Sequence, residues 1–143
     1  MHEALAGYSG TPLLKKLGIK EGARVSLVNV PRDFREELGP LPEGVEVVQP
    51  SSRRPLDFIL VFVKSQRQLG ENLSALRPKL SQNGMLWVAW PKKSSGVATD
   101  ISFTEVQAAG LALGIVDTKV CAVNDIWSGL KFVIRLKDRV AAP

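Results

Sequence analysis

A basic loop that contains two serines follows a strongly apolar segment, and it holds the residues best suited to bind an anion. Lys92 and Lys93 supply positive charge, and Gly96 permits a close approach of the backbone to a ligand. Ser94 and Ser95 add hydroxyl donors. A helix predicted to begin just beyond the loop would add the partial positive charge of its N-terminus. The pattern fits an anion-binding loop and also fits an ordinary solvated loop.

Trp90, Asn29 and Lys64 are the other candidates for ligand binding. Trp90 comes just before the basic loop and is suited to stack on a planar ring. Asn29 and Lys64 each follow an apolar segment that is typical of a strand. Open α/β sheets bind their ligands beyond the carboxyl ends of parallel strands. We therefore expect the three loops that follow these strands to converge on one site, namely residues 29–32, 64–66 and 90–96.

The titratable residues do not form a recognisable catalytic set. The candidate acids are Asp100, Asp117 and Asp125, and the candidate bases are Lys92, Lys93 and Lys119. The chain has one histidine, His2, and one cysteine, Cys121, so an internal disulfide is excluded and a Ser-His or Cys-His device or a zinc site is not expected. We interpret Cys121 as a small core residue and expect no bound metal.

Trp127 admits two interpretations. The sequence predicts that it lies in a turn, where a tryptophan either folds back on the core or marks a contact surface.

The formal net charge of +5 is concentrated in residues 51–100, which carry 8 basic and 3 acidic side chains. Such an excess favours an acidic ligand or partner, and it is equally typical of a solvated helix face. A nucleic-acid patch is one alternative, made by Arg53, Arg54, Arg67, Arg77 and Lys79. Only 6% of the residues are aromatic and no known binding module is present, so we do not expect a dedicated nucleic-acid role.

The 143 residues, 45% of them hydrophobic, are expected to form one domain over residues 1–143. Residues 1–20 would form an N-terminal helix and lead-in, and residues 137–143 a loose tail. No apolar run is long enough to cross a bilayer, and the N-terminus does not resemble a signal peptide. We expect a cytoplasmic protein without membrane association.

Apolar patterns and turn residues predict strands that alternate with helices. The predicted strands are residues 24–29, 45–48, 57–63, 85–90, 115–123 and 130–136. The predicted helices are residues 8–18, 32–38, 65–80 and 102–113. Thr11 would cap the first helix and Gly18 would close it, and Asn83-Gly84 would end the third. The apolar segment 57–63 is typical of a parallel strand covered on both faces. The order predicts a three-layer, Rossmann-like α/β fold with a mostly parallel sheet, helices on both faces and a C-terminal antiparallel hairpin. An exposed hairpin edge leaves dimerisation open.

Two helices have clear sequence signals. Leucines at positions 69, 73, 76 and 80 form one face of the first, and Pro78 lies near its end. Ser102 and Glu105 match a capping box at the start of the second, with Ile101 and Val106 as a hydrophobic staple. The buried side of this second helix is predicted to consist of Phe103, Val106, Gly110 and Leu113.

The order of elements resembles that of class I methyltransferases, and LGIKEGARV at residues 17–25 is similar to the lead-in to the first strand of that family. The resemblance implies S-adenosylmethionine as the cofactor, held by a glycine-rich loop after that strand. The matching segment here is Asn29-Val30-Pro31-Arg32, which contains no glycine, and there is room for one strand fewer before Asp57. We therefore expect a reduced version of that fold, with S-adenosylmethionine, a nucleotide or no cofactor as open alternatives.

Three short segments resemble the signatures of a bacterial family of unknown function. They are GYSGTPL at residues 7–13, WVAWPKK at 87–93 and WSGL at 127–130. The resemblance spans nearly the whole chain and implies neither an activity nor catalytic residues.

The leading functional hypothesis is a non-enzymatic or regulatory domain. It would bind an anionic small molecule or a protein partner through the loop 90–100. A degenerate methyltransferase and a non-specific nucleic-acid binder are the alternatives.

Overall fold

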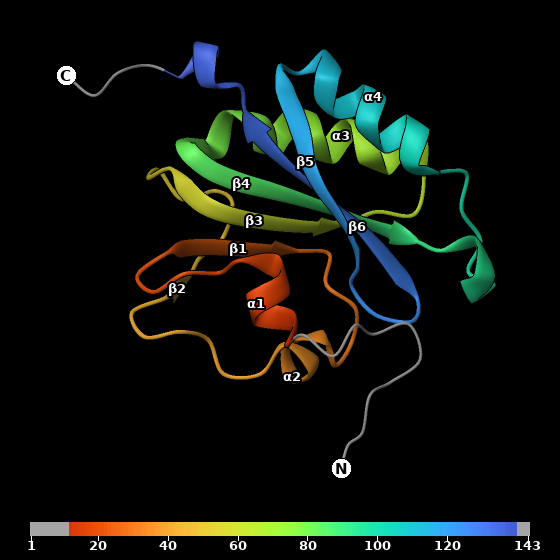
Figure 1. Ribbon diagram of the computed structural model, residues 1–143, viewed down its shortest axis with the longest axis horizontal. Coiled ribbons are helices and arrows are strands. Elements are labelled where there is room, and N and C mark those ends of the chain that lie inside the picture. Colours follow the sequence, from red (N-terminus) through yellow and green to blue (C-terminus); the bar gives the residue numbers. More distant parts are fainter. Residues whose placement is uncertain (1–11, 140–143) are drawn as a thin grey trace.

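The chain folds into a six-stranded sheet with helices on both faces, which confirms the predicted fold class (Figure 1). The computed structural model describes residues 12–139. The strands are β1 (Arg24–Val28), β2 (Glu46–Val47), β3 (Leu56–Phe62), β4 (Leu80–Pro91), β5 (Ile115–Ala122) and β6 (Trp127–Ile134). The helices are α1 (Leu13–Leu17), α2 (Phe34–Leu38), α3 (Gln66–Leu76) and α4 (Phe103–Ala112), with short 3₁₀ helices η1 (Arg77–Lys79), η2 (Lys93–Ser95) and η3 (Leu136–Asp138).

The order of the strands in the sheet is β2-β1-β3-β4-β6-β5. The first four pair in parallel, whereas β6 pairs antiparallel with both β4 and β5. The chain passes from β1 outward to β2, and from β3 in the opposite direction to β4. The direction of winding therefore reverses between β1 and β3, and such a reversal leaves a crevice at the carboxyl ends of the two strands.

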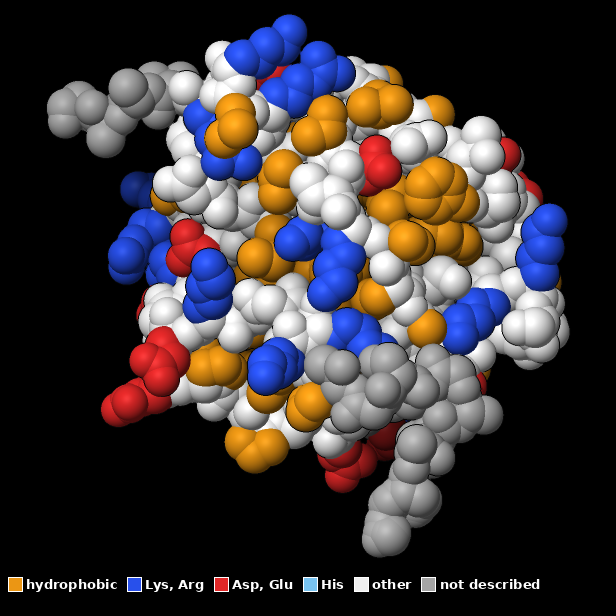
Figure 2. All heavy atoms as spheres, viewed as in Figure 1, with side chains coloured by type: hydrophobic (Ala, Val, Ile, Leu, Met, Phe, Trp, Pro, Cys, Tyr) orange, Lys and Arg blue, Asp and Glu red, His pale blue; other side chains and the backbone are white. Residues whose placement is uncertain are grey.

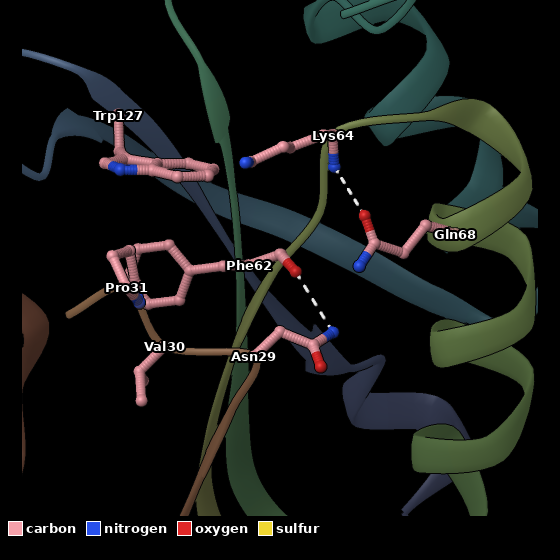
Figure 3. Close-up of a pocket in the computed structure, with 7 residues that line it drawn as sticks. All are labelled: Asn29, Val30, Pro31, Phe62, Lys64, Gln68 and Trp127. Carbon is pink, nitrogen blue, oxygen red and sulfur yellow. Dashed lines mark hydrogen bonds between the residues drawn. The ribbon is translucent and has the colours of Figure 1, made fainter. Parts of the chain in front are cut away.

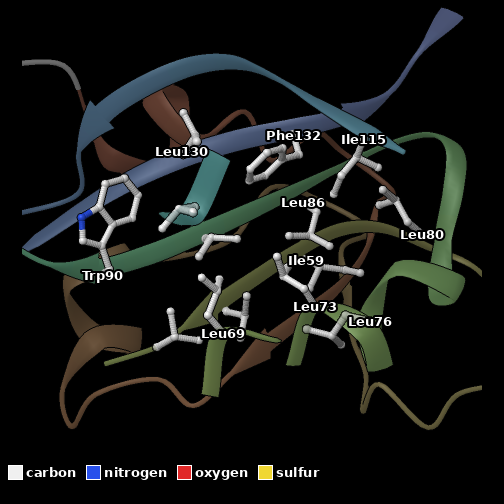
Figure 4. Packing of buried hydrophobic residues seen from close by; sticks show 14 of the residues in the cluster. Ile59, Leu69, Leu73, Leu76, Leu80, Leu86, Trp90, Ile115, Leu130 and Phe132 are labelled. Carbon is white, nitrogen blue, oxygen red and sulfur yellow. The ribbon is translucent and has the colours of Figure 1, made fainter. Parts of the chain in front are cut away.

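Alternating side chains of β3 and β4 contribute to two separate cores. On β3, Phe58, Leu60 and Phe62 pack with residues of α1 and α2, while Ile59 and Val61 pack with the leucines of α3 (Figure 4). All of these side chains are buried. This confirms the prediction that the strand is covered on both faces, because only such a strand needs an uninterrupted apolar sequence.

Helix α3 ends earlier than predicted. Its last residue is Leu76, and Pro78 lies in η1, since proline lacks an amide hydrogen and its ring disfavours a continued helix. Leu80 is therefore not on the helical face but is the first residue of β4, where it is the partner of Leu56.

The Asn83-Gly84 pair, predicted to end the helix, lies inside β4. The register of β3 against β4 is irregular next to this point, between Leu56 and Phe58. A Cβ atom at Gly84 would lie 2.9 Å from the carbonyl oxygen of Leu56. The glycine therefore permits a close approach of two strands and does not end an element.

Helix α4 begins with the predicted capping box. The Oε1 atom of Glu105 accepts hydrogen bonds from the amide of Ser102 at 2.6 Å and from its hydroxyl at 2.5 Å. Ile101 and Val106 are buried in the same cluster. The predicted buried side is wrong for Phe103, which is 39% exposed, because the helix meets the sheet along Val106 and Gly110 and its first residue projects past that contact. Leu113 is half-buried at the C-cap.

The hairpin β5–β6 closes through a shorter turn than predicted, at residues 123–126. The side-chain oxygen of Asn124 accepts from the amides of Ile126 and Trp127, each at 2.9 Å. Trp127 is therefore not in the turn but starts β6 opposite Pro91. It is buried, so it packs on the core and does not mark an exposed surface.

The ends of the described chain are ordered by local contacts. Gly18, at a φ of 85°, closes α1 as predicted. At the other end, η3 and a hydrogen bond from Nε of Arg139 to the Ile134 carbonyl (2.9 Å) lie where the sequence predicts a loose tail. The predicted Thr11 cap and most of the GYSGTPL segment fall outside the described residues. No described helix is both long and apolar enough to span a bilayer.

Candidate functional site

A pocket of about 330 Å³ opens where the winding of the sheet reverses, at the carboxyl ends of β1 and β3 (Figure 3). Its lining comes from the loop after β1, the end of β3, the first turn of α3 and the start of β6. The lining residues are Asn29, Val30, Pro31, Phe62, Lys64, Gln68 and Trp127. We call this cavity the switch-point pocket. It lies at the place where open α/β sheets bind ligands.

Asn29 directs the chain away from β1 and along the pocket. Its φ of 58° is in the left-handed region, which asparagine tolerates better than most residues with a side chain. Its Nδ2 atom donates to the Phe62 carbonyl at 3.2 Å and to Oδ1 of Asn72 at 3.4 Å. These bonds tie the end of β1 to β3 and α3, and they place Val30 and Pro31 on the pocket wall.

Lys64 is the charged residue of the lining. Its backbone is held from two sides, because its amide donates to Oε1 of Gln68 at 2.8 Å and its carbonyl accepts from the Thr99 hydroxyl at 2.6 Å. Its exposed side chain extends toward Trp127 (Figure 3). Because Oε1 of Gln68 is bonded to Lys64, the Nε2 donor of that amide points from α3 toward the pocket (Figure 3). The two side chains together offer a cation and an amide donor.

The opposite wall is aromatic. The rings of Phe62 and Trp127 meet edge to face, with centroids 4.9 Å apart and planes at 88°. Phe34 packs on the other side of Phe62 in the same manner, at 5.0 Å and 71°. Such contacts fix ring orientation, so the wall is rigid. The pocket thus combines a rigid apolar wall with one cationic group.

Trp90 is not part of this pocket. It is 6% exposed and packs in the core beneath α3 and α4 (Figure 4). Its alternation with Val88 and Leu86 on β4 places all three on that face, whereas Trp87 and Ala89 face the other core. Trp90 therefore faces away from the pocket, and the tryptophan that lines the pocket is Trp127.

The basic loop also lies outside the pocket. The amide of Lys92 donates to the Ile126 carbonyl at 2.7 Å, which pins the loop to the turn of the hairpin. The hydroxyl of Ser95 donates to the Lys92 carbonyl at 2.6 Å and accepts from the Val97 amide at 3.1 Å. Gly96 ends η2 at a φ of 79°. The remaining two candidates of the loop, Lys93 and Ser94, are exposed. Of the eight predicted site residues, the pocket brings together Asn29 and Lys64.

Carboxylates of the protein itself accept hydrogen bonds at the N-termini of α3 and α4. Oδ1 of Asp100 accepts from the Gln66 amide at 2.8 Å, at the beginning of α3. Glu105 fills the same role at α4, and hydrogen bonds from the hydroxyl and then the amide of Ser102 lower the pKa of its carboxyl group. The start of α4, which was expected to assist a bound anion, therefore already carries the carboxylate of Glu105.

The other candidate acids, Asp117 and Asp125, and the cysteine lie in places that local structure explains. Nε2 of Gln107 donates to both oxygens of Asp117, at 3.2 and 3.3 Å, and Asp125 lies in the hairpin turn. Cys121 is half-buried, and burial raises the pKa of its thiol although nearby lysines act in the opposite direction. Within residues 12–139, no group of three or more His, Cys, Asp and Glu side chains is placed to hold a metal ion.

Sequence reasoning missed Phe62, Gln68 and Trp127 as pocket residues. Gln68 stands three residues after the helix cap Ser65, the spacing of a capping box, and that signal was available. The alternation of side chains along a strand was a second signal, because it places Trp87 and Trp90 on opposite faces of β4. No local signal places Trp127, because its position depends on the register of β6 against β4.

Comparison with protein families identifies the chain. Residues 15–136 match the model of a family described as "Protein of unknown function (DUF3052)". The chain belongs to this family. The predicted membership in a family of unknown function agrees with this match, and DUF3052 carries no assigned activity. A comparison of the DUF3052 chain with curated proteins gives no match.

Several solved structures share the fold of the DUF3052 chain. A SAM-dependent methyltransferase from Aquifex aeolicus superposes with a TM-score of 0.62 at 18% identity, over 86% of this chain and 88% of that one. A precorrin-6y C5,15-methyltransferase from Geobacter metallireducens gives 0.60 at 11% identity, over 86% of each chain. Aeropyrum pernix fibrillarin with bound S-adenosyl-L-methionine gives 0.56 at 14%, over 89% and 70%. At these identities the likeness concerns the fold, and it confirms the predicted methyltransferase-like order of elements.

Proposed function

We propose that the protein binds a small molecule with an anionic group in the switch-point pocket. The observation that carries the proposal is a pocket at the reversal of winding whose lining holds a lysine and an amide opposite a rigid aromatic wall. A volume of about 330 Å³ falls at the lower end of the range for small-molecule sites.

The lining defines the chemistry of the ligand. Lys64 favours a phosphate or carboxylate group, and the Gln68 amide adds a neutral donor. Phe62, Trp127 and Pro31 favour an apolar or planar portion next to that group. None of the lining residues is acidic. A nucleotide, a sugar phosphate attached to a ring or an acyl phosphate has this combination of groups.

Methyl transfer from S-adenosylmethionine is the second candidate, and the fold similarity favours it. The pocket lining does not fit that cofactor well. The cofactor carries a net positive charge, and the lining contains Lys64 but no carboxylate to compensate for that charge. Pro31 also removes an amide donor from the loop after β1. We therefore assign no step of a reaction to this cofactor.

A thermal-shift screen with matched variants tests the proposal. The compounds are nucleotides, sugar phosphates, acyl-coenzyme A, S-adenosylmethionine and S-adenosylhomocysteine. An anionic ligand at ~100 times its Kd stabilises the protein by about 2.7 kcal/mol, which raises Tm by several degrees. We expect Lys64→Ala to abolish this rise. The double variant Lys92→Ala/Lys93→Ala removes charge from the basic loop instead and should retain it.

Three outcomes would redirect the assignment. Loss of the rise in the Lys92/Lys93 variant but not in Lys64→Ala would return the site to the basic loop. Stabilisation by S-adenosylmethionine that strengthens in Lys64→Ala would favour the methyltransferase-type candidate. A screen in which no anionic compound raises Tm would contradict a small-molecule site.

A further inference from the structure

A groove of about 440 Å³ runs along the hairpin, on the face opposite to α4. It is lined by Val116, Thr118, Val133, Ile134, Arg135, Leu136 and Arg139. We call it the hairpin groove. It is separate from the switch-point pocket, with which it shares no lining residue.

The groove exists because one face of the hairpin is uncovered at the end away from its turn, whereas α1 contacts the same face nearer the turn, at Lys119 and Ala122. Ile115 and Phe132 belong to the core beneath α4, so Val116 and its partner Val133 face the other way. On that side, α1 and α2 pack over β1, β3 and β4, and neither valine belongs to the core they form (Figure 1). Three layers thus become two at this end of the hairpin, and two apolar side chains remain half-buried at the surface.

The rim of the groove is cationic. Arg135 and Arg139 line it, and no acidic residue does. Within residues 12–139 neither arginine forms a salt bridge, and Asp138 of η3 does not line the groove. Lys131 is on the same face as Val133, two residues along β6. Hydrophobic side chains lie next to Lys and Arg side chains at this end of the molecule (Figure 2).

Leu136 adds an exposed apolar contact. It is 78% exposed, although it lies two residues after the buried Ile134, the last residue of β6. A leucine so placed gains little from folding of this chain, but it would gain from burial against a partner.

We propose that the hairpin groove binds an acidic amphipathic helix of a partner protein. In this fold, helices cover sheet faces of the same kind, as α4 does on the other side of the hairpin and α1 does on the same side of the sheet. The helix would place apolar side chains on Val116, Val133 and Leu136, and carboxylates beside the two arginines.

The charges and the shape of the hairpin disfavour other occupants. A symmetric dimer in which two such grooves meet would bring Arg135 and Arg139 against like charges. An extended peptide would have to pair with β5, whose register is irregular between Asp117 and Lys119. Nucleic acid would meet an apolar floor without an aromatic side chain for its bases to stack on.

Fluorescence anisotropy with designed peptides of about 15 residues tests the proposal on the full chain. The first peptide has leucines at helical spacing flanked by glutamates. The second replaces the glutamates by lysines, and the third has the composition of the first with leucine and glutamate alternating, which favours an extended strand. We expect the first peptide to bind most tightly, with an affinity that falls as salt rises.

Matched variants locate the binding. Arg135→Glu/Arg139→Glu should weaken binding of the first peptide on the order of tenfold or more, whereas Arg53→Glu/Arg54→Glu, with the same change in net charge, should leave it within about twofold. Leu136→Ala should weaken it several-fold without affecting folding, because that side chain is exposed. Chemical shifts of the Val116, Thr118 and Val133 amides should move on titration.

Four results would overturn the proposal. They are equal binding of the acidic and basic peptides, tighter binding of the alternating peptide, equal losses in the two arginine variants, and a dimer of the free protein that Leu136→Ala dissociates. The last result would assign the groove to a second copy of the chain. None of them depends on the switch-point pocket, so the two proposals can fail separately.

Discussion

Single residues determine how closely the layers approach one another. Gly110 lies where α4 crosses β6, and a Cβ atom there would overlap the ring of Phe132. That ring is fully buried, so it has little freedom to move aside. The close contact of this helix with the sheet therefore depends on the absence of one methyl group.

We expect Gly110→Ala to destabilise the protein by roughly 1–3 kcal/mol through overpacking. Gly70→Ala in α3 is the matched control, because a Cβ at Gly70 meets no atom within 4 Å. That control should be unchanged or more stable by up to about 1 kcal/mol, since alanine favours helix. Urea unfolding measures both. A Gly110→Ala protein as stable as the parent would show that α4 can shift on the sheet.

The site residues also show what local sequence can and cannot reveal. Asn29 and Lys64 were predictable, because residues that follow apolar strands collect at one edge of a parallel sheet. Trp90 does not line this pocket, because alternation along β4 turns it toward α3. Trp127 was not predictable as a pocket residue, since its position follows from pairing with a strand 36 residues earlier at Pro91.

At the scale of elements, the capping box of α4 couples stability to pH. The pKa of Glu105 is lowered in the folded protein by hydrogen bonds from Ser102. A lowered carboxyl pKa stabilises the fold fully above the unfolded pKa, about 4.3, and this stabilisation is lost as the pH falls through the lower folded pKa.

We expect Glu105→Gln to be less stable than the parent at neutral pH, with a difference that shrinks as the solution is acidified below about pH 4. Urea midpoints across a pH series measure this. The control is the same substitution in a Ser102→Ala background, where the loss should be smaller because the donor hydroxyl is gone. Parallel pH profiles for Glu105→Gln and the parent would contradict the role of the cap.

Element boundaries were predictable where local chemistry decides them. The start of α4, the end of α1 at Gly18 and the hairpin as a pair of strands all carry strong local signals. The boundary between α3 and β4 has no such local signal. Leu80 continues the leucine spacing of the helix, and only its pairing with Leu56 in the folded sheet makes it a strand residue.

At the scale of the whole molecule, the strands best shielded from solvent lie in the middle of the sheet. β3 and β4 are covered by two layers, whereas β2 is a two-residue edge strand and η3 ends the described chain. Local opening requires least energy where few apolar contacts are lost.

We expect backbone amides of β3 and β4 to exchange with solvent most slowly, at the rate of global unfolding, and those of β2 and η3 fastest. Hydrogen exchange followed by NMR measures each amide. Protection of β2 equal to that of β3 would mean that the edge is stabilised by contacts outside the described residues.

The placement of the three tryptophans gives the molecule an intrinsic optical readout. Trp87 donates from its indole nitrogen to the Leu17 carbonyl at 2.8 Å, and Trp90 is enclosed beneath α3 and α4. Trp127 alone lines the switch-point pocket, and the hairpin groove contains no tryptophan. Tryptophan emission from unlabelled protein should therefore change when a ligand fills the switch-point pocket. It should remain nearly constant when a peptide binds in the hairpin groove, so the emission intensity distinguishes the two binding events.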